Sequence, residues 1–193
     1  MPILGIIASQ ISGHLTPPDT GAMFPLGMVS VGSAGSSTIT FSSIPSTYKH
    51  LQVRAISRTN LASPGFASLT MELNSDTTSN YAWHRMWGNG STANAGATAS
   101  DSSMLFGVTS GDQNIANSFS IFICDILDYT STSKNKTIRA LTGGDDNTGS
   151  ANGYIGIHSG LWFKTPEAVT TVTIKPGAGQ SFKQYSSFAL YGI

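Results

Sequence analysis

Charged residues are scarce in this sequence. Asp, Glu, Lys and Arg make up 10% of its 193 residues, whereas an average soluble domain contains about 25%. The ten basic residues balance the ten acidic ones, so no net field draws the chain to nucleic acid or to an anionic membrane. We therefore expect no nucleic-acid partner and no membrane insertion. A neutral surface solvated by hydroxyl and amide groups also makes self-association easier.

Cysteine and long apolar runs are also in short supply. The single cysteine, Cys124, excludes a disulfide framework within the chain, and its apolar neighbours predict a buried hydrophobic position. No segment approaches the roughly 20 apolar residues that a membrane-spanning helix needs. The apolar N-terminus has no Lys or Arg before it, so a secretory signal is not expected.

The sequence does not contain the common catalytic and metal-binding patterns. Its four histidines lack the spacing of a helical metal site, and no G-x-S-x-G nucleophile motif is present. Asp145 and Asp146 are the only weak metal candidates, and a structural turn is favoured there because the loop lacks the spacing of an EF-hand. We expect a protein without enzymatic activity, catalytic residues, bound metal or cofactor.

What the sequence does have is period-two alternation from Met28 onwards. Leu51, Val53 and Ala55, for example, alternate with polar or charged neighbours, and residues two apart lie on one face of a strand. The pattern predicts an all-β fold, an antiparallel two-sheet sandwich of jelly-roll type. The expected strands cover residues 28–31, 37–41, 50–58, 66–73, 81–87, 104–108, 118–127, 137–141, 154–163, 169–175 and 186–191.

Two parts of the chain depart from simple alternation. Residues 118–127 are apolar on both faces, which predicts a central strand covered on both sides. Residues 88–100 are small and uncharged and are expected to form a long loop, like residues 143–153 and 176–180.

The first 27 residues are predicted to form an extended N-terminal arm, followed by a β-sandwich domain of residues 28–193. Proline and glycine interrupt regular structure throughout residues 17–27. Before them lies an apolar segment suited to docking into a neighbouring subunit or particle, with the candidate residues Ile3, Leu4, Ile6, Ile7, Ile11 and Leu15.

A row of aromatic residues is the candidate ligand contact. Tyr81, Trp83 and Trp87 share one strand face, with Arg85 between them. Such rings stack on the apolar faces of sugars, but large aromatic residues also fill sandwich cores, and core filling is the favoured interpretation. The charge on Arg85 argues that this face is not wholly buried.

Several segments resemble small virion proteins of tailed bacteriophages. The resemblance covers most of the chain and rests on residues 3–13 (ILGIIASQISG), 41–54 (FSSIPSTYKHLQVR), 80–84 (NYAWH), 125–129 (DILDY), 159–162 (SGLW) and 187–193 (SFALYGI). Members of this group are described as tail-fibre, minor tail or uncharacterised structural proteins. The resemblance implies a virion component assembled in the bacterial cytoplasm and brings no catalytic residues.

Three hypotheses for the function follow. The first is a tail-fibre or minor tail protein that docks through its arm, presents loops to a host-surface glycan and forms a homo-oligomer, expected to be a trimer. The second is a capsid decoration protein that stabilises the head shell. The third, from another class, is a carbohydrate-binding module.

Overall fold

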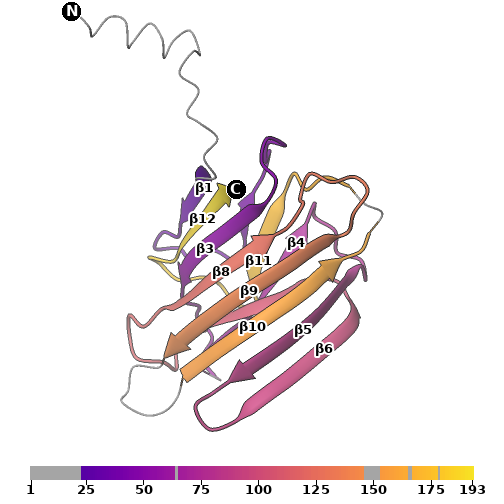
Figure 1. The fold of residues 1–193 in the computed structure, drawn as a ribbon. Helices are drawn as coiled ribbons and strands as arrows, with labels where there is room; N and C mark the ends of the chain where they lie inside the picture. The colour runs from indigo at the N-terminus through magenta and orange to yellow at the C-terminus, as the bar shows by residue number, and fades with distance from the viewer. Residues whose placement is uncertain (1–22, 64, 146–152, 165–166, 178) are drawn as a thin grey trace, which may run out of the picture.

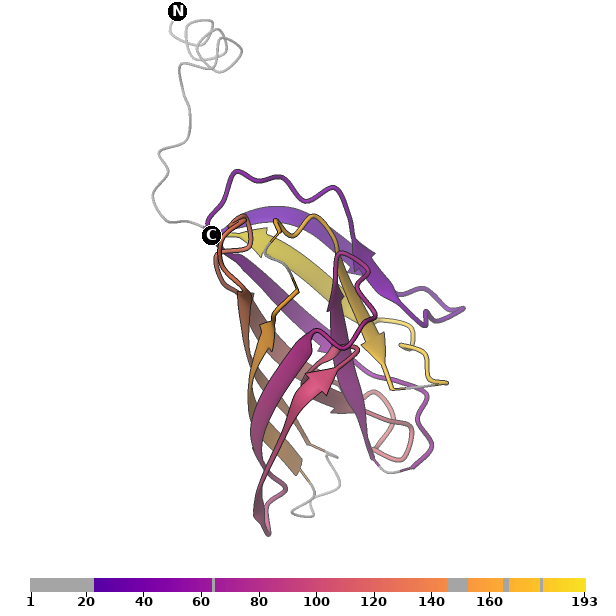
Figure 2. The same cartoon turned by 90° about the vertical axis from the view of Figure 1, so that its right-hand side faces the viewer.

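The structure is a computed structural model that describes residues 23–63, 65–145, 153–164, 167–177 and 179–193. The proposed docking residues of the arm and Asp146 lie outside this part of the chain. Within the described residues the chain forms twelve strands and no helix. The strands build two antiparallel sheets that face each other (Figures 1 and 2). The predicted all-β two-sheet sandwich is therefore confirmed.

The larger sheet has eight strands, and Figure 1 looks onto its outer face, with the smaller sheet behind it. Each strand pairs antiparallel with its neighbours. In spatial order they are β1 (Phe24–Ser30), β12 (Ser187–Gly192), β3 (Leu51–Ser57), β8 (Ser120–Ile126), β9 (Lys136–Asp145), β10 (Gly153–Trp162), β5 (Tyr81–Gly88) and β6 (Ala93–Asp101).

The smaller sheet has four strands and covers the inner face of the larger one. Its spatial order is β2 (Ile39–Phe41), β11 (Val172–Pro176), β4 (Phe66–Leu73) and β7 (Met104–Ser110). Strand β7 lies across β9 and β10. Because β7 packs against the larger sheet at the edge of the smaller one, it is buried along its whole length.

The core lies between the sheets and is built from the inward half of each alternating strand. In β3, Leu51 and Val53 are fully buried while Arg54 and Ile56 are exposed. Phe122 of β8 packs against Phe106 and Phe188, with ring centroids 5.1 and 6.1 Å away. Cys124 is buried and free, and burial raises its pKa, so it is an inert core residue as expected.

Several of the expected boundaries were wrong. Residues 93–100, expected to belong to a loop, form most of the edge strand β6. The loop expected over residues 143–153 is shorter, because β9 continues to Asp145 and β10 begins at Gly153. The strand expected over residues 169–175 begins at Val172. Strand β1 begins at Phe24, so residues 24–27 belong to the sandwich, although they were assigned to the arm. Pro25 is tolerated because β1 is an edge strand with a register shift between Pro25 and Gly27.

Candidate functional site

Tyr81 of the aromatic row belongs to the core. Its side chain is fully buried and stacks on Trp162, with ring centroids 6.4 Å apart. The backbone N–H of Leu73 donates to the Tyr81 hydroxyl over 2.9 Å, and that hydroxyl donates to the Asp76 carbonyl over 3.1 Å. Tyr81 therefore has no exposed surface for a ligand, and the ligand contact considered for it is wrong because its ring and hydroxyl are both used inside the fold.

Trp83, Arg85 and Trp87 continue this row towards the end of β5 and are only partly buried. The Arg85 guanidinium lies 4.0 Å from the Trp87 ring centroid and 5.7 Å from that of Trp83. Gly96 on β6 stands opposite Arg85, and a Cβ there would come within 3.4 Å of the Arg85 Nε. The cation is thus stacked on aromatic faces over a glycine, an arrangement that stabilises an arginine by cation–π contact.

Strand β10 adds Tyr154 and His158 to the same inner side of the sheet. His158 pairs with Arg85 in the β10–β5 ladder and is fully buried. Gly156 lies between Tyr154 and His158, and a Cβ at Gly156 would come 2.8 Å from the Tyr154 ring and 3.0 Å from His158 Nε2. The absence of a side chain at Gly156 is what lets both rings lie over the strand.

The electrostatics of this cluster keep its two rings neutral. Burial, followed by the charge on Arg85, lowers the pKa of His158 to about 4. Burial raises the pKa of Tyr154, although Arg85 opposes the rise. A neutral imidazole, a neutral phenol and one cation provide cation–π and hydrogen-bonding surface. They do not supply a nucleophile with its own base, which acyl or glycosyl transfer would need.

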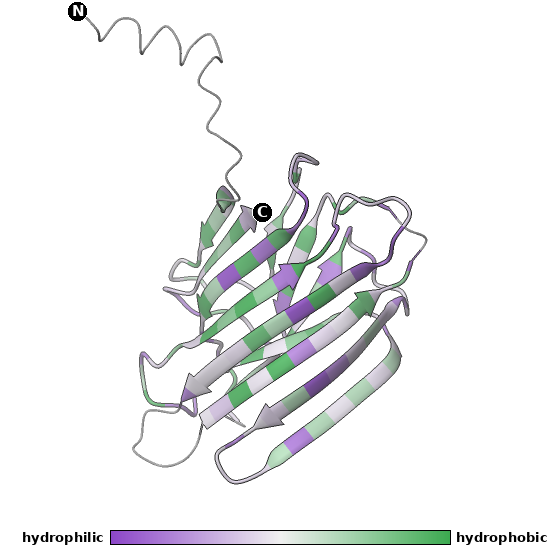
Figure 3. Ribbon diagram, viewed as in Figure 1, coloured by the Kyte–Doolittle hydropathy of each residue, from purple (hydrophilic) through white to green (hydrophobic). Residues whose placement is uncertain are grey.

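The larger sheet carries a second notable surface on its opposite side. We call it the outer apolar face, and it consists of eight side chains whose exposed fractions run from 40% for Ile123 to 73% for Met28. In Figure 3 hydrophobic segments recur along β8, β9 and β10, the strands that form its centre. Its members are Met28, Ile56, Met86, Ile121, Ile123, Leu141, Ile155 and Ile157.

The strand register gathers these side chains into two adjacent rows. In the first row Ile123, Leu141, Ile157 and Met86 are successive cross-strand partners from β8 to β5. In the second row Ile56 pairs with Ile121, Ile121 with Gly143 and Gly143 with Ile155. Residues directly opposite one another on neighbouring strands touch, so the seven members on β3, β8, β9, β10 and β5 form one continuous apolar surface. Met28 on β1 lies apart from them, because Ala189 and the exposed Arg54 stand between Met28 and Ile123 in the ladder.

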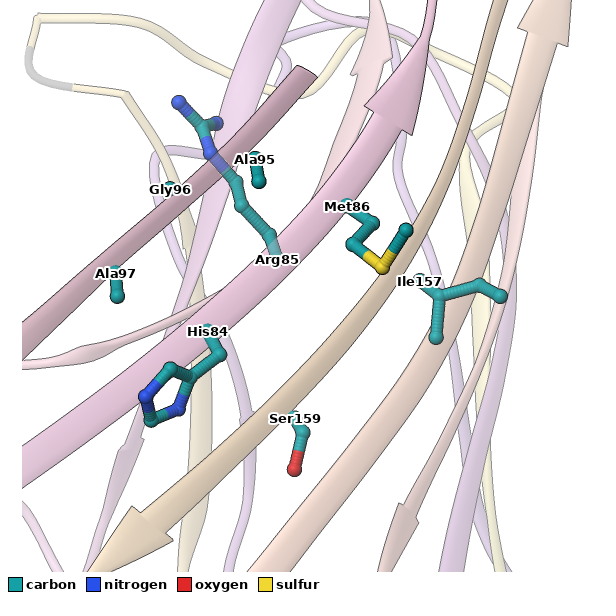
Figure 4. Close-up of a pocket in the computed structure, with 8 residues that line it drawn as sticks. All are labelled: His84, Arg85, Met86, Ala95, Gly96, Ala97, Ile157 and Ser159. Atoms are coloured by element: carbon teal, nitrogen blue, oxygen red, sulfur yellow. The ribbon is translucent and has the colours of Figure 1, made fainter. Parts of the chain in front are cut away.

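Small residues leave hollows in this surface. At Gly143 a hollow of about 300 Å³ opens between Ile121, Ile123, Leu141 and Ile155. A second hollow, of about 550 Å³, is lined by Met86, Ile157 and the small side chains of β6, with His84 and Ser159 at its border (Figure 4). The face therefore has projecting side chains next to depressions of side-chain size.

A polar row borders the apolar rows, and its one carboxylate is paired. Arg139 donates to Asp125 over 2.9 Å, and Gln52 donates to the other Asp125 oxygen over 2.7 Å. Arg54 donates to Gln52 over 2.7 Å and contacts the sulfur of Met23, the first described residue. Met23 therefore lies at the border of the outer apolar face.

Sequence reasoning missed the exposure of this face. Strand β8 is central in the sheet and apolar on both sides, as predicted, but the described residues cover only its inner side. Tyr154 and His158 were also missed as neighbours of Arg85. Their signal was the spacing Tyr154-Gly156-His158, which places two rings on one face around a glycine.

The remaining candidate, the pair Asp145 and Asp146, is only partly described. Asp145 ends β9 as an exposed residue, and its neighbour Asp146 is outside the described part. In the described part of the chain, no three His, Cys, Asp or Glu side chains are grouped as metal ligands would be. Those same residues include no helix with the length and hydropathy of a membrane span.

No protein-family model, curated protein or solved structure matches this chain.

Proposed function

We propose that this chain is a non-enzymatic structural protein of a bacteriophage virion, a tail-fibre or minor tail component that acts as a building block of the particle. The observation that carries the proposal is the outer apolar face. Soluble monomers rarely expose a continuous apolar patch larger than a few hundred Å², and such patches mark interaction surfaces. A protein that presents eight large apolar side chains on one sheet is suited to permanent assembly.

The size of the face supports assembly on energetic grounds. Ile121, Ile155 and Ile157 are each 60% exposed or slightly more. Covering one of these side chains removes on the order of 100 Å² from water, which stabilises a contact by about 2.5 kcal/mol. Seven such contiguous side chains offset a large part of the cost of association.

The strand connections support a body of jelly-roll type. Along the chain, β2, β4, β7 and β11 belong to the smaller sheet, while β3, β5, β6 and β8 belong to the larger one. The chain thus crosses repeatedly between the sheets, as in the double Greek key of a jelly roll. In this interpretation the β9–β10 hairpin is inserted between β8 and β5, and β12 and β1 extend the edge.

The arm and the loops complete the proposal. The arm docks the protein into the particle through its apolar residues, and it joins the sandwich where Met23 contacts Arg54. The loops at the ends of the sandwich face the host surface. This division of roles places attachment at the N-terminus and recognition on the rigid β body.

Labelling of intact virions tests the proposal. An antibody raised against the described sandwich should decorate the tail of purified particles, and quantitative mass spectrometry should find a few to some tens of copies per particle. Hundreds of copies on the head would instead favour the decoration protein. Particles that lack the protein altogether would contradict a virion role of either kind.

A glycan-binding role is the second candidate, because Trp83 and Trp87 are partly exposed beside Arg85. Aromatic faces with polar neighbours provide the stacking surface that sugars use. Asn94 of β6 pairs with Trp87 and contributes an amide at the same place. This role is compatible with a tail position, where it would supply the host contact.

A further inference from the structure

We infer that the outer apolar face is a symmetric contact for a second copy of this chain, with the two larger sheets packed face to face. The inference deepens the proposed function, because it names the partner of the surface on which that proposal rests. Sheets pack face to face about 10 Å apart with interdigitating side chains. The outer apolar face supplies half of such a packing, and a second copy supplies the other half.

The area of the face matches what a stable pair needs. Its seven contiguous side chains are between 40% and 69% exposed, and at on the order of 100 Å² each they present about 700 Å² in total. A standard stable interface buries about 800 Å² on each partner. The contiguous apolar side chains therefore account for most of an interface of ordinary size.

The face has both projecting side chains and depressions. Ile121, Ile155 and Ile157 project beside the hollow at Gly143, and Met86 projects beside the small side chains Ala95 and Ala97 of β6. A two-fold axis through the face brings the projecting residues of one copy over the depressions of the other. The same patch then serves on both copies, which is the property of a closed two-fold contact.

The charges near the face permit this approach. Like charges brought together across an interface would oppose it, but the Asp125 carboxylate is paired with Arg139 and Gln52 within each copy. The exposed Arg54, which donates to Gln52, lies beyond Ile123 at the end of the first apolar row, at the margin of the contact. This paired row runs along one side of the two apolar rows. It therefore becomes a polar border on one side of an apolar centre, in keeping with the polar rim of protein interfaces.

The two-fold contact differs from the trimer that the sequence led us to expect. A trimer needs a head-to-tail contact between two different patches. The contiguous part of the outer apolar face runs across β3, β8, β9, β10 and β5 and is a single patch. It matches itself, so the favoured assembly through this face is a dimer.

Light scattering coupled to size exclusion tests the inference on the full-length protein. The wild type should elute at about 40 kDa, twice the 20.2 kDa of one chain. Two single variants, Ile121→Lys and Ile157→Lys, each place two desolvated ammonium groups in the interface, one from each copy. Each should raise the dissociation constant of the dimer by at least about 100-fold. Ile115→Lys is the matched control, because Ile115 is 46% exposed but lies outside the sheet.

Folding of each variant is checked by its thermal unfolding. The replaced side chains are mostly exposed, so the unfolding temperature extrapolated to the monomer should change little. Ile157→Ser serves as a milder second variant and should weaken the pair without introducing charge. A wild type that is monomeric at about 100 μM, a trimer, or a dimer that Ile157→Lys leaves intact would each overturn the inference.

Cross-linking locates the contact directly. Cys124 is buried, so a cysteine introduced in the variant Leu141→Cys is the reactive one, and a short thiol cross-linker should join two copies. Ser68→Cys, on the exposed face of the smaller sheet, should remain uncoupled. If removal of residues 1–15 abolished the dimer and Leu141→Cys did not couple, the arm would be the occupant and the face-to-face contact would be refuted.

The two proposals can fail separately. Oligomeric state is measured on the purified chain, whereas the virion role is measured on particles. A dimer that is absent from virions would leave this inference standing and overturn the proposed function. A monomer found in virions would overturn this inference and leave the proposed function standing.

Discussion

At the scale of single residues, Asp76 is a buried carboxylate held by several hydrogen bonds. It is 6% exposed and accepts hydrogen bonds from the Trp162 indole at 2.8 Å, from Asn80 at 2.9 Å and from Thr78. Burial raises the pKa of its carboxyl, but these hydrogen bonds together hold the pKa well below its usual value of 3.8. The ionised form is therefore the one that stabilises the fold.

We predict that Asp76→Asn lowers the free energy of unfolding by about 1–3 kcal/mol at pH 7, because charge-assisted hydrogen bonds are lost. A depressed carboxyl pKa stabilises the fold above the unfolded pKa near 3.8, and this contribution disappears as the pH falls below it. Urea unfolding at pH 7 and pH 3 should show the variant losing less stability than the wild type. Equal losses in both proteins would contradict the role of Asp76.

His158 makes the fold sensitive to a higher pH window. Its pKa is lowered from 6.5 to about 4 by burial and by Arg85, so protonation favours the unfolded state. Its contribution to stability is present above pH 6.5 and falls by about 3 kcal/mol as the pH drops towards 4. In His158→Leu the unfolding free energy should be nearly constant across this window. If wild type and variant had parallel pH profiles, His158 would not be the titrating group.

Trp87 allows a test of the glycan contact. If the Trp83–Arg85–Trp87 row binds sugar, a glycan array should give specific binding that Trp87→Ala weakens by about tenfold or more, since stacking on one ring contributes on the order of 1.4 kcal/mol. Ile115→Ala is the control, because it removes an exposed apolar residue elsewhere. An array without signal would remove this function and leave the structural role.

At the scale of elements, most strands follow directly from alternation. Phe66–Leu73 was predicted with both ends correct, because its apolar and polar residues alternate between two clearly different environments. Strand β6 was not predicted, since Ala, Gly, Asn and Thr have low or mixed β propensity and offer little contrast. The neglected signal was Asn89-Gly90, a dipeptide typical of tight hairpin turns.

The β5–β6 turn gives a prediction for this hairpin. Gly90 has a φ of 88°, and Asn89 Oδ1 accepts hydrogen bonds from the backbone N–H groups of Ser91 and Thr92. Gly90→Ala should destabilise the hairpin by about 1 kcal/mol because a side chain disfavours that φ. Amide hydrogen exchange should accelerate in β6 while β8 and β9 stay protected. Gly32→Ala, at a position with open space, should change neither region.

The outer apolar face shows where sequence reasoning reaches its limit. A run such as Ile121-Phe122-Ile123-Cys124 indicates a strand that is apolar on both faces, but the same residues suit a strand covered by its own chain or by another one. Which of the two applies depends on whether a second layer of the same chain packs against the outer side of the strand. Only the three-dimensional arrangement shows that the smaller sheet covers the opposite side.

At the scale of the whole molecule, the interior between the sheets and the outer apolar face have different roles. The interior between the sheets holds the fold together, with Phe122, Phe106 and Phe188 in contact. The outer apolar face adds nothing to the stability of one chain while it faces water. A neutral surface with few charges reduces the repulsion between copies, so the composition and the exposed face both favour assembly.

The arm supplies the last prediction. Removing residues 1–15 takes away all six proposed docking residues, but the sandwich begins at Phe24, so the truncated chain should keep its strands and its unfolding temperature. Because the outer apolar face is intact, the truncated protein should still pair. Particles assembled from it should lack the protein, as shown by mass spectrometry of purified virions. Incorporation at the wild-type level would mean that another surface attaches the protein to the particle, and the docking role of the arm would have to be abandoned.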